Sequence, residues 1–229
     1  MLLDADFQLI NEDFSAEFVT ARQLDKLLAN GWRHFGMHFF RYNLGIYQNE
    51  LRRVIPLRFR LQDMQLSKSQ RRVLRKNSDL DVSIQPIVLT DETHDLFDRH
   101  KQRFKSGVPA TINEFLSLDA ANEPTEGLEV VVRRSGKLLA ASFFDLGNTS
   151  ISSVYAIFEP NEVSRSLGIY TMLKEIEYAI AIGKEYYYPG YAYEGESFYD
   201  YKKRFAPTEV FDWQGNWHDF NPGASNLND

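Results

Sequence analysis

The chain has 229 residues, of which 43% are hydrophobic and 25% charged, and 32 acidic against 26 basic residues give a net charge of −6. A protein of this size buries roughly 70% of its unfolded surface, and this composition excludes an intrinsically disordered chain. The lack of cysteine excludes disulfides, thiol nucleophiles and Cys-ligated zinc or iron–sulfur clusters. No stretch approaches the roughly 18 apolar residues of a membrane span, and the N-terminus does not resemble a secretory signal. We expect a cytoplasmic protein with no membrane contact, and the negative charge argues at first sight against a nucleic-acid partner.

The first half of the chain alternates between helical and extended patterns. Helices are predicted over residues 20–30, 67–78 and 90–104, and strands over residues 35–42, 52–61 and 82–89. Ser67 and Gln70 form the capping box S-x-x-Q at the start of the second helix. Pro56 cannot donate a ladder hydrogen bond, so the strand that contains it is expected to be an edge strand or a broken one.

The second half begins with a long loop over residues 105–126, a candidate active-site flap or a seam between parts of the fold. Three antiparallel strands with tight turns are then predicted over residues 128–134, 137–145 and 150–158. A helix follows that ends at Gly183, and the strand 185–191 is expected to join the same sheet in parallel with an earlier strand. The tail 214–229 loses periodicity and is expected to be frayed.

The helix predicted over residues 67–78 concentrates positive charge. Nine basic residues and one acidic residue lie between Arg52 and Lys76, so this segment carries +8 and the remainder −14. At 100° per residue, five basic side chains fall within about 140° of arc: Lys68, Arg71, Arg72, Arg75 and Lys76. A solvated helix face usually mixes both signs. The pattern favours a polyanion-binding surface over an ordinary solvated face.

The segment 165–170 joins a predicted strand to a predicted helix and suits an anion. A helix N-terminus presents unpaired N–H groups and partial positive charge, which can hold a phosphate or a developing oxyanion. Gly168 would let a ligand approach the backbone, and Arg165 would add a fixed cation. The predicted phosphate-binding residues are therefore Arg165, Ser166, Leu167 and Gly168. An ordinary helix start is the alternative.

The segment 185–205 holds seven of the twelve tyrosines. A tyrosine ring can stack on a base or ribose and donate a hydrogen bond, which suits the 3′ end of a nucleic acid. Core packing of the same rings is the alternative. The histidines do not indicate a metal site, and the sequence has no P-loop, G-x-S-x-G, G-x-G-x-x-G or H-E-x-x-H motif.

Several strings resemble, in the same order, the arginyl- and leucyl-tRNA–protein transferases of the N-degron pathway, chiefly the bacterial branch. They are LSKSQRRVLRKNSDL (66–80), YAIFEP (155–160), RSLGIYTMLKEIEYA (165–179), YYPGY (187–191) and YKKRFAPTEVF (201–211). A weaker resemblance reaches back to LDKLLANGWRHFG (24–36). The similarity covers most of residues 24–211.

The resemblance implies an α+β fold with a GNAT-like acyltransferase domain, in which helices flank a mixed, mostly antiparallel sheet. It places this catalytic domain at residues 86–213, after a smaller N-terminal subdomain at 1–85. The R-x-x-G junction stands where acetyltransferases hold the pyrophosphate of their cofactor. Tyr170 replaces the final small residue of that motif, which argues against acetyl-CoA as the donor.

The activity that the resemblance implies is transfer of an amino acid from a charged tRNA to an amine, such as a protein N-terminus, without a cofactor. Lys68, Arg71, Arg72 and Arg75 would hold the acceptor stem. The expected pocket residues are Tyr170, Tyr191, Tyr201 and Lys202. The candidates for catalysis are Tyr155, Asp145 and Glu159, and either carboxylate could accept the proton of the amine.

The chain departs from this family at its N-terminal cysteine motif, which binds metal or an iron–sulfur cluster. The corresponding residues 41–59 contain no cysteine, so no metal cluster is expected. Because that region is linked to the acceptor, the departure bears on acceptor specificity more than on the donor. Two alternative functions are a GNAT-family N-acyltransferase that uses acyl-CoA and a non-catalytic module that binds nucleic acid or protein.

Overall fold

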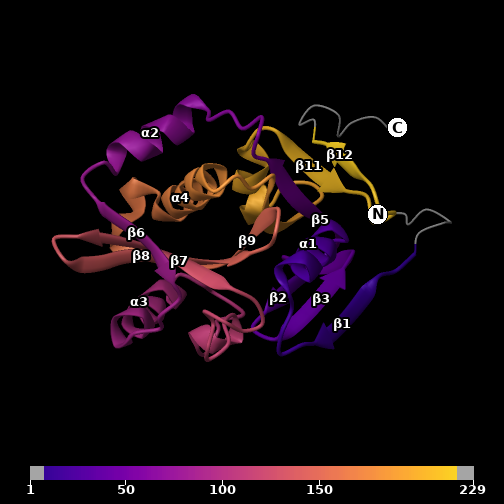
Figure 1. Ribbon diagram of the computed structural model, residues 1–229, viewed down its shortest axis with the longest axis horizontal. Helices are drawn as coiled ribbons and strands as arrows, with labels where there is room; N and C mark the ends of the chain where they lie inside the picture. Colours follow the sequence, from indigo (N-terminus) through magenta and orange to yellow (C-terminus); the bar gives the residue numbers. More distant parts are fainter. Residues whose placement is uncertain (1–7, 221–229) are drawn as a thin grey trace.

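The computed structural model describes residues 8–220, and its centre is a mixed sheet of nine strands (Figure 1). Eight strands follow the order β12-β11-β5-β10-β9-β8-β7-β6, and β4 pairs with β5 outside this path. Among the described residues, β9 and β10 run parallel, whereas the other neighbours are antiparallel. The strands are β4 (Leu44–Tyr47), β5 (Glu50–Arg60), β6 (Asp81–Pro86), β7 (Gly127–Arg134), β8 (Lys137–Leu146), β9 (Ser150–Phe158), β10 (Tyr186–Tyr193), β11 (Thr208–Phe211) and β12 (Trp217–Asp219).

Helices cover both faces of this sheet. α2 (Lys68–Lys76) and α4 (Leu167–Ala181) lie on one face, and α3 (Asp91–Lys101) lies on the other (Figure 1). The apolar run of β8 is therefore buried on both sides, with Phe144 in the core under α4 and Phe143 in the core under α3. The arrangement confirms the predicted α+β class, and the GNAT-like order of meander, helix and parallel strand is present.

A second sheet, of order β1-β3-β2, lies beside β10. It consists of β1 (Asn11–Ser15), β2 (Arg33–Phe35) and β3 (His38–Tyr42). α1 (Ala21–Ala29) starts at the Thr20 capping box and packs Leu24 and Leu28 against Tyr188 of β10. The strand predicted over 35–42 is interrupted, because Gly36 turns the chain with a φ of +50° that glycine adopts without strain.

β5 lies inside the sheet, so the prediction that Pro56 marks an edge or broken strand is wrong. One side of β5 pairs with β10, where Pro56 is opposite Tyr191. On the other side β4 pairs with residues 50–53 and β11 with residues 57–59. Pro56 falls between these two partners, so its missing N–H interrupts neither ladder.

The other predicted elements lie close to their expected positions. α2 begins at the predicted Ser67–Gln70 capping box, and α3 begins at a corresponding box on Thr90. The described part of the chain also contains three short 3₁₀ helices: η1 (Ile112–Glu114), η2 (Pro160–Arg165) and η3 (Phe198–Arg204). Within residues 8–220, no helix combines the length and apolarity needed to cross a bilayer.

The predicted boundary at residue 85 falls inside the central sheet. β5 precedes it and β6 spans it, yet both pair with strands that follow it. The division into residues 1–85 and 86–213 stays a prediction. In the predicted tail, β12 pairs with β11 at Trp217–Asp219, and residues 221–229 lie outside the described part of the chain.

The Asp25 carboxylate ties α1 to the turn between β8 and β9. It accepts hydrogen bonds from the Thr149 backbone N–H (2.9 Å), the Thr149 hydroxyl (3.2 Å) and the Ser150 hydroxyl (2.6 Å). We expect Asp25→Ala to lower the free energy of unfolding by about 2 kcal/mol, because these bonds reach a charged acceptor. Thermal unfolding should show a Tm lower by about 6 °C. Exposed Glu17 serves as the control, and equal Tm values for Glu17→Ala and Asp25→Ala would contradict this role.

Candidate active site at the opening between two parallel strands

β9 and β10 separate after three paired residues. They pair from Ser150 and Tyr186 to Ser152 and Tyr188. Beyond that point the register of β9 against β8 shifts by a bulge next to Ser153, and the register of β10 against β5 shifts before Gly190. The two bulges bend the strands apart, and residues 153–156 of β9 are half-buried rather than buried. We call this gap the opening.

Arg33 of β2 bridges the two strands at the start of the opening. Its guanidinium donates to the Ser152 hydroxyl (3.0 Å), to the Tyr188 carbonyl (3.4 Å) and to the Ser153 carbonyl. Burial lowers the pKa of Arg33, and the nearby Tyr191 and Asp145 partly oppose this effect. The Arg33 guanidinium thus bridges β9 and β10 by hydrogen bonds where their backbone pairing ends, and it places a positive charge there.

Lys202 of η3 brings a second cation to the same place. Its side chain is 9% exposed, and its Nζ donates to the Tyr191 carbonyl at 3.0 Å. Burial, helped by the charge of Arg33, lowers the pKa of Lys202 to about 7. A methyl group on Gly190 would lie 3.3 Å from Lys202 Nζ and 3.7 Å from Arg33 Nε, so both cations face one space. We call Arg33 and Lys202 the cation pair.

No carboxylate of the described residues makes an ion pair with either member of the cation pair. Their partners are backbone carbonyls and one hydroxyl. Two buried cations close together repel each other and lose hydration, which is costly unless an anion joins them. The arrangement suits a carboxylate ligand.

Aromatic rings surround this space. Tyr191 donates to the Gly31 carbonyl at 2.6 Å, and burial raises its pKa. Tyr155 lies on the β9 side of the opening, but its ring packs against the core under α3 and stacks on Phe115 with centroids 3.8 Å apart; its buried hydroxyl has no hydrogen-bond partner in the described part of the chain. Four further tyrosines contact one another or Tyr191: Tyr42, Tyr47, Tyr193 and Tyr199. Such rings can hold an apolar side chain or a nucleoside.

A buried acid lies on the α4 side of the opening. Glu175 is 1% exposed, and its Oε2 accepts a hydrogen bond of 2.6 Å from the Tyr187 hydroxyl. Burial raises the pKa of Glu175 to about 7, and the hydroxyls of Ser142 and Ser153 oppose this by favouring the charged form. Burial also raises the pKa of Tyr201 to about 12, with a contribution from Glu175.

The predicted catalytic and pocket residues are only partly brought together. Tyr191 and Lys202 lie at the opening. The Tyr201 ring packs against the core under α4, and the Tyr155 ring packs against the core under α3. Asp145 is close to it, but its carboxylate binds the His34 ring at 2.8 Å. Glu159 is remote, paired with Arg99 at 3.0 Å and Lys137 at 3.9 Å near α3. Both predicted proton acceptors are therefore already engaged, and their roles stay predictions.

The basic residues of α2 form one exposed face. Lys68, Arg71, Arg72 and Arg75 are exposed, and none makes an ion pair with a described carboxylate. We call these four residues the basic face. Arg71 donates to the Leu66 carbonyl, which leaves its charge uncompensated. Since most bases elsewhere in residues 8–220 do have acidic partners, the basic face stands out as a surface for an anion.

The predicted phosphate-binding junction is organised differently from the expectation. The Arg165 guanidinium donates two hydrogen bonds to the Asp79 carboxylate (2.8 and 2.9 Å) and pairs with Glu162 at 3.2 Å. Its positive charge is therefore already neutralised by acidic side chains. A methyl group on Gly168 would lie 3.0 Å from the Phe158 ring, so this glycine permits close packing of helix on strand. Ser166 is exposed and Leu167 is buried. Phosphate binding by these residues stays a prediction.

The same junction joins α2 to α4. The Asn77 side chain donates to the Arg165 carbonyl at 2.9 Å, and Lys76 Nζ donates to the Ser164 carbonyl at 2.5 Å. The buried Tyr170 hydroxyl donates to the Asn77 carbonyl at 3.3 Å. Tyr170 therefore lies away from the pocket predicted for it and holds the two helices together.

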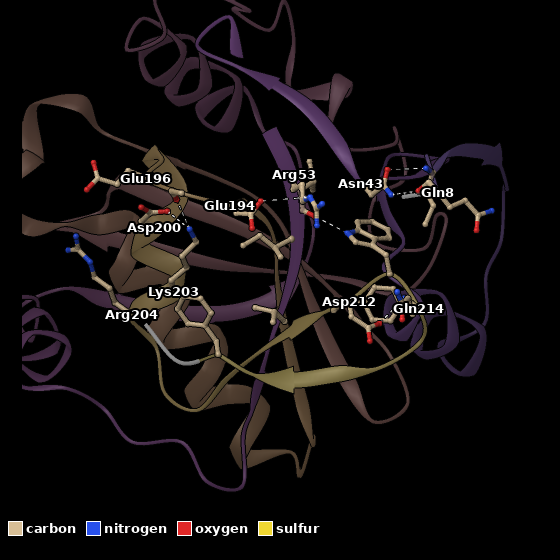
Figure 2. Close-up of a pocket in the computed structure, with 18 residues that line it drawn as sticks. Gln8, Asn43, Arg53, Glu194, Glu196, Asp200, Lys203, Arg204, Asp212 and Gln214 are labelled. Carbon is tan, nitrogen blue, oxygen red and sulfur yellow. Dashed lines mark hydrogen bonds and ion pairs between the residues drawn. The ribbon is translucent and has the colours of Figure 1, made fainter. Parts of the chain in front are cut away.

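A separate cavity of about 950 Å³ lies beside β5 and the end of β10 (Figure 2). Many polar groups of its lining pair with one another: Lys203 binds Asp200 at 2.9 Å, and Asp212 accepts hydrogen bonds from Gln214 and Asn216. Figure 2 shows Arg53 directed toward Glu194, 4.0 Å away. None of the residues predicted for the site lines this cavity. Among the described residues, no cluster of His, Asp or Glu could hold a metal ion.

Sequence reasoning missed Arg33 and Glu175. Arg33 lies within the weaker matching string 24–36, but nothing local indicates that it reaches β9. Glu175 stands between Lys174 and Glu177 in what reads as a solvated charge cluster. One signal was available: Glu175 is three residues after Met172 and four before Ala179, on the apolar stripe of the helix.

The chain is similar to several known proteins. A family model described as "Arginine-tRNA-protein transferase, C terminus" matches residues 92–212. An aspartate/glutamate leucyltransferase of Acinetobacter baumannii is 28% identical over 213 residues, which cover 91% of this chain and 75% of that protein. One from Saccharophagus degradans is 34% identical over 186 residues, 79% of this chain and 76% of that protein. Among solved structures, FemX aligns with 77% of this chain and 61% of its own at 10% identity, with a TM-score of 0.47.

Proposed function

The chain belongs to the aminoacyl-tRNA–protein transferase family, and we propose that it moves leucine from leucyl-tRNA to proteins that begin with aspartate or glutamate. The transferred leucine and the acceptor residues follow the name of the relatives, aspartate/glutamate leucyltransferase. In this reaction the acceptor amine attacks the ester carbonyl, a C–N bond forms and the ester C–O bond breaks. The 3′-terminal oxygen of the tRNA leaves with a proton that came from the amine.

The cation pair is the observation that carries this proposal. A buried ammonium and guanidinium that lack a carboxylate can bind one supplied by a ligand. The side chain of an acceptor that begins with aspartate or glutamate supplies such a carboxylate next to its reactive amine. Binding there would place the amine at the opening, which converts binding energy into orientation.

The donor would approach from the basic face. Four exposed, uncompensated bases on one helix can follow the phosphates of an acceptor stem. The aromatic rings around the opening would receive the 3′ adenosine or the leucyl side chain. Oxyanion stabilisation would come from the cation pair or from N–H groups freed where β9 and β10 separate.

The acyl-CoA alternative finds less support in the same geometry. The cation that would meet a pyrophosphate, Arg165, is bound by Asp79 in a bidentate pair. Calorimetry with CoA should therefore detect no saturable binding. Tight binding of CoA would instead favour an acyl-CoA-dependent enzyme.

The decisive experiment supplies labelled leucyl-tRNA with peptides that differ only in their first residue. We expect label on peptides that begin with Asp or Glu and none on the peptide that begins with Asn, which has the same shape as Asp without its charge. Arginyl-tRNA serves as the second donor. Transfer to Asn as readily as to Asp, or transfer to none of them, would overturn the proposal.

The charge of Lys202 makes acceptor binding depend on pH. Its pKa of about 7 in the free protein would rise when a carboxylate binds beside it. The charged form therefore binds best, and KM for the Asp peptide should rise as pH increases above 7, by up to about tenfold per pH unit, until the pKa of the bound form is passed. KM measured between about pH 6 and 9 tests this. In Lys202→Arg the side chain stays charged, so KM should be flat; a flat wild-type profile would contradict the assignment.

A further inference from the structure

Glu175 is a buried acid that the proposed recognition of donor and acceptor does not use. It projects from α4 toward the sheet, and Tyr187 of β10 holds its Oε2. Its Oε1 and the Ser142 hydroxyl are both buried, and neither makes a hydrogen bond in the described part of the chain, although Ser142 is close enough to favour the charged form of Glu175. A buried carboxyl with one oxygen left unpaired is costly, so packing alone does not account for it.

Ser153 connects this acid to the opening. It is the first residue of β9 beyond the part paired with β10, and it is half-buried. Its carbonyl accepts from Arg33, whereas its hydroxyl is close enough to favour the charged form of Glu175 and of Tyr187. Ser153 thus contacts Arg33 of the cation pair through its carbonyl, and its hydroxyl belongs to the surroundings of Glu175 and Tyr187.

The transfer needs a proton acceptor. The α-amino group of a peptide is largely protonated at neutral pH and must lose a proton to attack the ester. The two carboxylates predicted to accept this proton, Asp145 and Glu159, are paired with His34 and Arg99. The Oε1 atom of Glu175, by contrast, makes no hydrogen bond to a described residue and can accept a proton.

We propose that Glu175 accepts the proton of the attacking amine through the Ser153 hydroxyl, while Tyr187 fixes the orientation of the carboxyl group. The ammonium first loses one proton to solvent, which gives the neutral amine. As the C–N bond forms, this amine gives a second proton to Ser153 Oγ, and the serine proton passes to Glu175 Oε1. The same route returns a proton to the 3′ oxygen when the ester C–O bond breaks, so the enzyme ends unchanged. This inference rests on the proposed function.

The surroundings of Glu175 allow it to exchange protons near neutrality. Burial raises its pKa to about 7. The titratable groups that face it are Tyr187 on β10, Tyr201 on η3 and Asp145 on β8. Both tyrosines have raised pKa values and stay neutral at pH 7. Below pH 7 Glu175 is protonated and cannot accept, so kcat should rise with pH through about 7.

The test compares Glu175→Gln with Glu177→Gln, since Glu177 is exposed on the same helix and paired with Lys174. For Glu175→Gln we expect kcat to fall about 100-fold, KM for leucyl-tRNA to stay unchanged and the rise near pH 7 to disappear. Glutamine can still accept from Tyr187, so Tm should not fall. Ser153→Ala should also lower kcat, and the double variant should be no slower than Glu175→Gln because the two residues act in one route.

Each outcome decides the matter. The amine of the acceptor also titrates and can produce its own rise of kcat with pH. The experiment therefore uses two Asp peptides whose amines differ in pKa. The rise due to Glu175 occurs at the same pH with both peptides, whereas the rise due to the amine shifts with the pKa of the peptide. If wild type and Glu177→Gln transfer leucine and Glu175→Gln does so with the same kcat and pH profile, this inference is overturned and the proposed function stands. If wild type transfers no leucine, both are overturned.

Discussion

Replacing Lys202 by methionine is expected to lower kcat/KM for a peptide beginning with Asp by about 100-fold. Removing one partner of a buried charge pair costs about 2–5 kcal/mol, and about 2.8 kcal/mol corresponds to two factors of ten. Methionine keeps the length of the chain and removes an ammonium that is poorly hydrated at 9% exposure, so the fold should be retained. The measurement is steady-state transfer from leucyl-tRNA to Asp and Asn peptides.

Lys203 provides a matched control for this variant. It is the next residue, but its ammonium binds the carbonyls of Tyr193 and Gly195 and pairs with Asp200 outside the opening. Lys203→Met should keep the wild-type preference for Asp over Asn, whereas Lys202→Met should lose it. An equal preference for Asp over Asn in both variants would show that the cation pair does not recognise the acceptor side chain.

Reversing the charge of Arg71 and Arg75 together is expected to weaken binding of leucyl-tRNA by about 100-fold at moderate salt. Four bases that neutralise phosphates give a log–log salt slope of about −3, and removal of two contacts should reduce it to about −1.5. Both side chains are exposed, so the double variant Arg71→Glu/Arg75→Glu should fold normally. Fluorescence anisotropy across a salt series measures both quantities.

The control for this pair makes the same change of charge elsewhere. Arg22 and Lys105 are exposed bases outside α2. Arg22→Glu/Lys105→Glu should weaken binding only slightly and leave the slope near −3. If both double variants reduce the slope equally, the tRNA responds to total charge and the basic face has no special role.

Local rules explain which parts of the fold could be predicted. The capping boxes at Ser67 and Thr90 and the turns of the β7–β9 meander depend on residues close in sequence, and these elements appear where expected. Pro56 was misread because its tolerance depends on where β4 and β11 stop along β5, and those contacts are remote in sequence.

The site was harder to predict, because its parts come from four elements. Arg33, Ser153, Glu175 and Lys202 meet only after β2, β9, α4 and η3 have packed together. Tyrosines of the 185–205 segment and Lys202 were found because they crowd one stretch of sequence. Arg165 looked like an available cation because Asp79, which neutralises it, lies 86 positions away.

The hydrogen bonds that join α2 to α4 fix the distance between the basic face and the opening. Asn77, Lys76 and Tyr170 fix the basic face relative to the helix that carries Glu175. If the basic face holds the acceptor stem, as we propose, the distance from the stem to the opening is constant and must match the reach of the single-stranded 3′ end of the donor. An aminoacylated RNA with a shortened or lengthened 3′ end would hold its stem on α2 and present its ester out of register with the amine.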